Sequence, residues 1–259
     1  MRAVGKEERA ALENVHKLIH VGDERRLAMW ARLASLQSPV DEADRRLARM
    51  LFAVLYGKEI ATDVRAEALW AEHALLREEI AGLVPVLREL NAVLAEPHTL
   101  AIEIPLALHA RYLGVELSAA FDHRTNKGRF RDYYTGVELT QGKKFDLLLV
   151  TLDKAAGTKE HLRYRDFPLN DRRFHWQSKS RTTRESKEGR RHLNPAKSGV
   201  TPLLFVRERA DERAGVTMAF QYLGPVAPDG AEGERPITIE WRLKYAMPRE
   251  VLQTGKIAG

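Results

Sequence analysis

The hydrophobic period of this chain changes beyond residue 100, and this change most constrains the fold. Before residue 100, apolar residues recur every three to four positions, as in the stretch 27–36, which is the spacing of a helix face. Further along, short runs follow a period of two, as in 237–243. The sequence therefore predicts an α+β protein, with a helical bundle in residues 1–99 and a β-rich domain in residues 100–259.

Local signals mark several of these elements. In "SPVDEADRRLARMLFAVLYG", Ser38 can cap a helix, Pro39 suits its first turn and Gly57 follows its end. One more helix is expected in "PLALHARYLGVELSAAF". Four strand candidates follow it, namely "FDLLLVTL", "TPLLFVRE", "VTMAFQYLG" and "RPITIEWRL". Several short strands after a helix predict a curved sheet or a small barrel.

Charge is unevenly distributed along the chain. The formal net charge is +6, yet the first hundred residues hold 14 basic and 16 acidic residues, whereas the remainder holds 28 and 20. Such an asymmetry favours a polyanionic partner. The absence of cysteine excludes disulfides and thiolate metal sites. Because the sequence lacks a run of eighteen apolar residues and a secretory leader, we expect a cytoplasmic protein without membrane contact.

Signatures of catalysis are missing from the sequence. It contains no Walker loop, no His-Glu-x-x-His zinc motif and no Gly-x-Ser-x-Gly elbow. Asp146, followed by Asp153 and Lys154, is similar to a metal-dependent nuclease strand, but adjacent strand residues point to opposite faces. We interpret these three as structural surface charges. No catalytic residue, metal ligand or cofactor is expected.

Basic residues are concentrated in two stretches. Residues 171–197 hold nine basic and three acidic residues, and "HRTNKGRFRDYYTG" upstream interleaves cations with aromatic rings. Cations can pair with phosphates while rings stack on bases. The alternative is a solvated surface, with Phe174 and Trp176 in the core and His175 and Gln177 facing outward. The candidates for phosphate contacts are Arg129, Arg131, Arg172, Arg173, Lys179, Arg181, Arg184, Arg190 and Arg191.

Several stretches resemble a known family in their order along the chain. They are "LIHVGDERRLAMWARL", "RRLARMLFAVLYG", "PLALHARYLGVELSAAF", "LLLVTLDK", "YRDFPLNDRRFHWQSKS", "LLFVRER" and "GERPITIEWRL". The chain resembles, from about His20 to Pro248, an uncharacterised domain family at the C-terminal end of certain bacterial DEAD/DEAH-box helicases, which often carry a phospholipase-D-type nuclease. Some of those proteins are similar to modification-dependent (Type IV) restriction enzymes. The chain departs from the family pattern at 189–193, where Gly-Arg-Arg-His-Leu replaces Gly-Gln-Arg-Tyr-Ile.

The resemblance implies a helical coupler followed by a target-recognition barrel similar to SRA or PUA-like domains. Such a domain would read 5-methylcytosine in double-stranded DNA by base flipping, with helicase and nuclease domains as partners in cis or in trans. The base-pocket candidates are Tyr133, Tyr134, Tyr164, Asp153, Asp166, His175, Gln177 and Ser178. The expected structural residues are Phe174, Trp176, Arg111, Tyr112 and Glu116, the last three on one helix where an ion pair is expected.

Three other classes of function stay open on the sequence, one of them a nuclease without a recognisable motif. An RNA-binding PUA-like module fits the charge equally well. A protein-interaction or coupler domain of a helicase explains the helices, but it leaves the concentration of positive charge unexplained.

Overall fold

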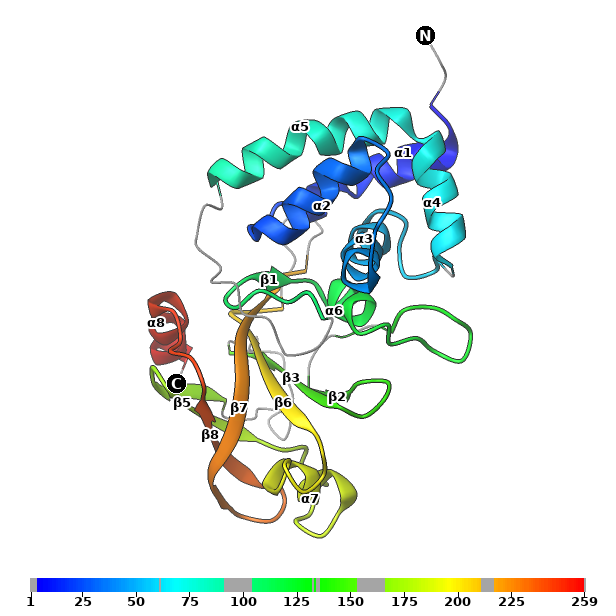
Figure 1. The fold of residues 1–259 in the computed structure, drawn as a ribbon. Coiled ribbons are helices and arrows are strands. Elements are labelled where there is room, and N and C mark those ends of the chain that lie inside the picture. Colours follow the sequence, from blue (N-terminus) through cyan, green and yellow to red (C-terminus); the bar gives the residue numbers. More distant parts are fainter. Residues whose placement is uncertain are drawn as a thin grey trace. The chain divides into compact units, whose positions relative to one another are not determined.

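The computed structural model describes residues 4–60, 62–90, 104–131, 133, 136–152, 166–210 and 217–258. The chain forms two compact units, Met1–Tyr133 and Tyr134–Gly259. The sequence predicted a boundary after residue 99. In the structure, the first unit continues to Tyr133. The α+β class is confirmed, since helices build the first unit and a mixed sheet builds most of the second (Figure 1).

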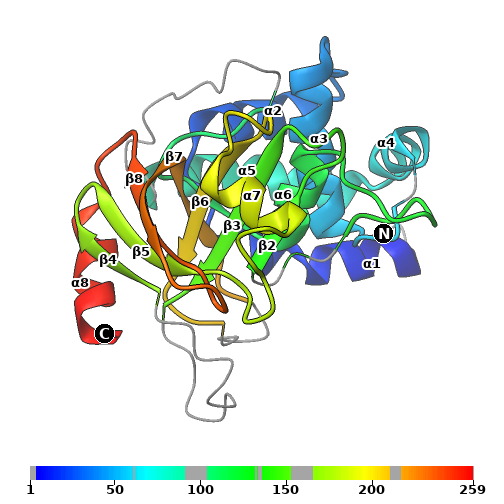
Figure 2. The same ribbon diagram turned by 90° about the horizontal axis from the view of Figure 1, so that it is seen from below.

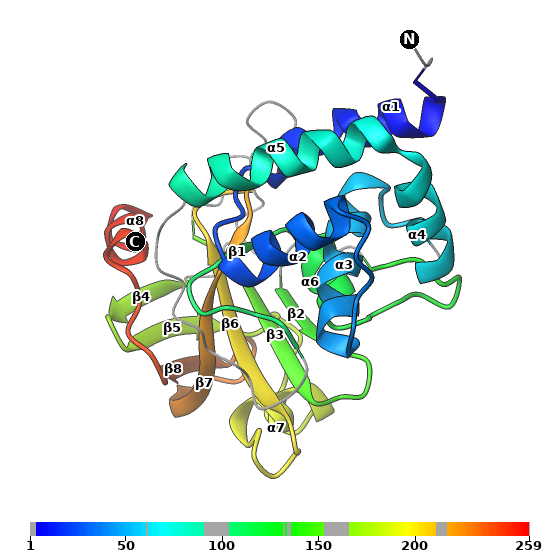
Figure 3. The ribbon, with the colours of Figure 1, turned by 45° about the horizontal axis from the view of Figure 1, so that its top comes forward.

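The first unit is mainly helical. Its elements are α1 (Lys6–Glu13), the short 3-10 helix η1 (Val15–Leu18), α2 (Glu24–Ala34), α3 (Glu42–Leu55), α4 (Asp63–Glu72), α5 (Ala74–Leu90), the two-residue strand β1 (Arg111–Tyr112) and α6 (Gly114–Ala120). Helix α2 packs along α5 (Figure 3), and α3 packs on α6. Trp30, Leu51 and Leu76 are fully buried between these helices.

Carboxylate side chains cap two of these helices. Asp41 accepts a hydrogen bond from the Asp44 amide at 2.8 Å, so α3 begins at Glu42. The prediction of a cap at Ser38 is therefore wrong, because the competing carboxylate lies one turn further along. Asp23 caps α2 in the same way, accepting from the Arg26 amide at 3.1 Å.

A buried ionic cluster joins α2 to α6 within the first unit. The Arg26 guanidinium is fully buried, pairs with Asp23 and donates to Glu116 Oε1 at 2.8 Å and to the Arg111 carbonyl at 2.7 Å. It also lies 4.2 Å from the centre of the Tyr112 ring. His20 Nε2 lies 2.7 Å from Glu116 Oε2. The cluster therefore connects two stretches that are far apart in the sequence.

The helix expected over 105–121 is wrong in its first half. Arg111 and Tyr112 form β1, and α6 begins only at Gly114. The interruption lies at His109, whose φ of +64° is incompatible with a right-handed helix. The expected structural ion pair on that helix is replaced by the pair of Glu116 with Arg26, while the Arg111 side chain is exposed.

The second unit contains the remaining strands. They are β2 (Gly136–Leu139), β3 (Phe145–Thr151), β4 (Phe167–Asn170), β5 (Arg173–Gln177), β6 (Thr201–Arg207), β7 (Phe220–Glu232) and β8 (Thr238–Leu243), with the helices α7 (Lys187–Leu193) and α8 (Arg249–Ala258). The strand order is β2-β3-β6-β7-β8-β5-β4. Strands β3 and β6 run parallel, and the other neighbours run antiparallel. Figure 2 shows β5 between β4 and β8.

The sheet of the second unit is open, so the expected closed barrel is wrong. Among the described strands, the order ends at β2 and β4, which have four residues each. Strand β4 carries Pro168, which has no amide hydrogen for a further strand, as is typical of an edge. The long strand β7 pairs with β6 through 221–225 and with β8 through 226–232, and it thereby joins two halves of the sheet.

Aromatic side chains fill the core of the second unit. Phe174 and Trp176 of β5 pack with Trp241 and Ile239 of β8 in one apolar cluster, and the two indole rings lie 6.0 Å apart. Within the described ranges, no helix is both long and apolar enough to cross a membrane.

Candidate nucleic-acid interface

Strand β5 separates core residues from surface residues by simple alternation. Phe174 is 0 % exposed and Trp176 is 3 % exposed, whereas Arg173, His175 and Gln177 are more accessible. Because successive strand residues point to opposite faces, these three polar side chains share the other face of the sheet. This placement agrees with the interpretation that the two aromatic residues are structural.

Three base-pocket candidates lie close together at β4 and β5. The His175 ring stacks on Phe167 with a centroid separation of 4.6 Å and an interplanar angle of 13°. The backbone amide of Gln177 donates to Asp166 Oδ1 at 3.0 Å, and the side-chain Nε2 of Gln177 donates to Thr238 Oγ1 at 3.4 Å. Asp166, His175 and Gln177 thus form one polar group beside an aromatic ring.

Two further candidates are held in buried contacts. Ser178 is 0 % exposed, and its Oγ accepts from the Ile237 amide at 2.9 Å and donates to the Lys179 carbonyl at 3.2 Å. Tyr133 belongs to the first unit, is 3 % exposed and shares a hydrogen bond with His123 Nδ1. The remaining candidates, Tyr134, Tyr164 and Asp153, lie outside the described residues.

All nine basic residues in 171–197 are exposed or partly exposed. Apart from Arg191, four of them form ion pairs with other described residues, with N–O distances of 3.0 Å for Arg173–Asp229, 3.1 Å for Lys179–Glu188, 3.8 Å for Arg184–Glu234 and 3.6 Å for Arg190–Glu185. Exposed pairs of this kind contribute about 0–1 kcal/mol. Arg173, Lys179 and Arg190 can therefore exchange a carboxylate for a phosphate at little cost. The Arg184 guanidinium also donates to the carbonyls of Gly233 and Ala231, each at 2.9 Å.

Arg191 is the exception in this segment. Its side chain is 16 % exposed, and its Nε donates at 2.5 Å to Asp146 Oδ2, which belongs to β3. Asp146 is 1 % exposed, so the interpretation of Asp146 as a surface charge is wrong. Burial raises the pKa of Asp146, against the opposing effect of the Arg191 charge. Arg191 is thus held in a structural contact. Asp153 and Lys154 lie outside the described residues.

A helix cap and a close backbone contact fix the turn before α7. Ser186 caps the helix by accepting from the Gly189 amide at 3.0 Å. A Cβ on Gly189 would lie 2.0 Å from the Thr183 carbonyl oxygen, so only glycine fits there. Further along α7, the His192 side chain is buried, and its ring meets Trp176 edge-on with a centroid separation of 5.2 Å. Burial, with the charges of Arg191 and Lys179, lowers the pKa of His192 to about 3.

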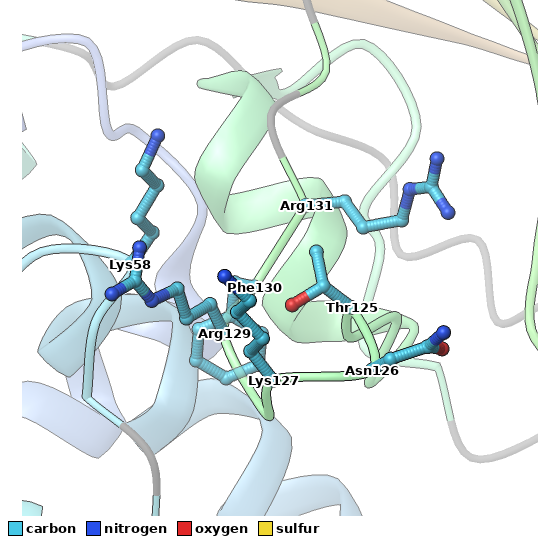
Figure 4. Close-up of a pocket in the computed structure, with 7 residues that line it drawn as sticks. All are labelled: Lys58, Thr125, Asn126, Lys127, Arg129, Phe130 and Arg131. Atoms are coloured by element: carbon cyan, nitrogen blue, oxygen red, sulfur yellow. The ribbon is translucent and has the colours of Figure 1, made fainter.

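The two upstream phosphate candidates, Arg129 and Arg131, line a groove of the first unit (Figure 4). The groove has a volume of about 520 Å³. Its lining consists of Lys58, Thr125, Asn126, Lys127, Arg129, Phe130 and Arg131. Lys58 was not predicted, because no local signal in the sequence associates an isolated lysine after α3 with a basic stretch far along the chain.

Comparison with known proteins gives one family. No curated protein matches the chain. The family model described as "Domain of unknown function (DUF3427)" matches residues 106–254, which is more than half of the chain. The match begins within the first unit and covers most of the second. Its description states no activity. The chain therefore belongs to the family of domains of unknown function DUF3427.

Proposed function

We propose that this chain is a DNA-binding target-recognition module of a modification-dependent restriction system. It reads a modified base, with 5-methylcytosine as the expected one, while helicase and nuclease domains act with it in cis or in trans. One observation carries the proposal. Residues 171–197 have a net charge of +6, which equals the net charge of the whole chain. The rest of the chain is therefore electrically balanced, and the positive charge is local.

The accessible cations of this segment supply the affinity for DNA. A protein that neutralises several phosphates releases condensed counterions, which makes binding strong at low salt and independent of sequence. Such contacts orient the protein on the duplex, and base contacts then supply the specificity. The weak ion pairs of Arg173, Lys179 and Arg190 leave these side chains available for that role.

The group formed by Asp166, His175 and Gln177 supports the base-reading part of the proposal. A flipped base is recognised by hydrogen bonds to its Watson–Crick edge and by stacking, which offset an unstacking cost of a few kcal/mol. A carboxylate can accept from the exocyclic amine of cytosine. The group offers the Asp166 carboxylate, the Gln177 side-chain amide and the stack of His175 on Phe167 in one place. Tyr134 and Tyr164 remain stacking candidates on the sequence alone.

Fluorescence anisotropy with one labelled duplex, carrying either cytosine or 5-methylcytosine, tests the proposal at 50 and 200 mM salt. We expect tighter binding to the methylated duplex, and a loss of affinity of at least about tenfold between the two salt concentrations. An RNA duplex of the same sequence serves as competitor. Equal affinity for both DNA duplexes would refute the reading of 5-methylcytosine, and stronger competition by RNA would favour the RNA-binding alternative.

A further inference from the structure

The first unit carries its own concentration of positive charge. Met1–Tyr133 contains 19 basic and 20 acidic residues, so the unit as a whole is nearly neutral. Its groove nevertheless gathers Lys58, Lys127, Arg129 and Arg131. Among the residues that the structure describes, no aspartate or glutamate lines it. We propose that this groove binds the phosphodiester backbone of nucleic acid. The first unit then binds the DNA, as the second unit also does.

Backbone hydrogen bonds hold the groove in place. The Phe130 amide donates to the Lys58 carbonyl at 3.0 Å, which ties the basic loop to the connection after α3. The Arg131 amide donates to Ser118 Oγ at 2.8 Å, which ties the same loop to α6. At the tip, the Thr125 amide donates to the Arg129 carbonyl at 2.8 Å. The cations are thus presented by a fixed loop, which reduces the entropy lost on binding.

The aromatic residue of the loop points into the unit and supports the groove. Phe130 is 2 % exposed, and the Arg124 guanidinium lies 4.1 Å from the centre of its ring. Arg124 also pairs with Asp122 at 2.8 Å. Arg124 and Phe130 are therefore structural, and Lys127 and Arg131 are left with exposed side chains.

The distribution of charge around the groove fits an extended polyanion. In Figure 4, Arg129 extends toward Lys58, whereas Arg131 and Asn126 extend to the opposite side. Cations on both sides suit a chain of phosphates better than a single anion, and the Thr125 hydroxyl and Asn126 amide add neutral donors at the turn. Arg129 pairs with Glu59, but both side chains are 51 % exposed, so a phosphate can replace this carboxylate.

The choice of DNA as the occupant rests on the proposed function. The experiment therefore tests phosphate binding by the groove separately from the reading of a methylated base. The full-length variant Lys127→Gln with Arg131→Gln removes two groove charges, and its binding to the plain and methylated duplexes is measured at 50 and 200 mM salt. Two lost phosphate contacts lower the slope of log K against log salt by about 1.8. The ratio of affinities at 50 and 200 mM salt then falls about tenfold.

Two further variants make the result specific. Lys6→Gln with Arg9→Gln removes the same charge from exposed positions of α1 in the same unit, and its slope should stay at the parent value. Lys127→Arg with Arg131→Lys keeps the charge and should restore the parent slope. An unchanged slope for the groove variant, or an equal change in the α1 variant, would refute the proposal that the groove binds the nucleic-acid backbone. The ratio of affinities for methylated and plain duplex should be the same in all variants, because phosphate contacts do not read the base. A parent protein without methyl preference would contradict only the proposed function.

Discussion

Replacing Glu116 with glutamine tests the buried ionic cluster of the first unit. Glu116 and Arg26 are both fully buried and lie 2.8 Å apart. The substitution keeps the shape of the side chain but leaves the Arg26 charge with Asp23 as its remaining carboxylate partner in the cluster. Removing one partner of a buried pair costs about 3–5 kcal/mol. Because glutamine still offers one acceptor, we expect the lower end, about 3 kcal/mol, as the loss in the free energy of unfolding.

A matched control is the exposed pair of Glu24 with Arg88. The side chains of Glu24 and Arg88 are 65 % and 42 % exposed, and such a pair contributes less than about 1 kcal/mol. Glu24→Gln removes the same charge from the same unit. Urea titration read by hydrogen–deuterium exchange of peptides from α2 and α6 reports the first unit separately. Equal losses in Glu116→Gln and Glu24→Gln would refute the reasoning.

The pKa of Glu116 gives the same variant a second signature. Burial acts to raise this pKa, but the charges of His20 and Arg26 outweigh it, so the pKa lies below its usual value. A lowered carboxyl pKa contributes stability above the unfolded pKa of about 4.3, and this contribution is lost as the pH falls through the folded pKa. The parent should therefore lose more stability on acidification below about pH 4 than Glu116→Gln.

Two further predictions concern the second unit and the helix packing. His192, whose folded pKa is about 3, stays neutral while the unfolded chain takes up a proton near pH 6.5, so stability falls by about 2 kcal/mol between pH 7 and pH 5. His192→Gln should flatten that fall in urea titrations at the two pH values, and an unchanged fall would contradict it. Gly189→Ala should lower the free energy of unfolding by about 2 kcal/mol or more, because its Cβ meets the Thr183 carbonyl. Gly82→Ala, within α5, should raise it by up to about 1 kcal/mol, because an added Cβ has no neighbour there. Thermal melts compare the two, and equal shifts would refute the steric argument.

The sequence by itself determined the features that depend on neighbouring residues. Its hydrophobic period separated helices from strands and gave the α+β class, and its alternation at 174–177 correctly assigned Phe174 and Trp176 to the core. These features could be predicted because side-chain direction in a helix or strand follows directly from position along the chain. The positive charge of 171–197 could be predicted because it depends on the composition of the segment alone.

Only the tertiary structure decided which distant groups meet. Glu116 pairs with Arg26 rather than with Arg111, and Asp146 is buried in a pair with Arg191 rather than exposed at the surface. Lys58 joined the basic loop through the Phe130 amide. The open sheet likewise depends on which strands lie at its two ends, β2 and β4, and local periodicity does not decide that. Periodicity describes local direction, whereas ion pairs, grooves and sheet closure depend on how separate segments come together, and that is decided by packing over the whole unit.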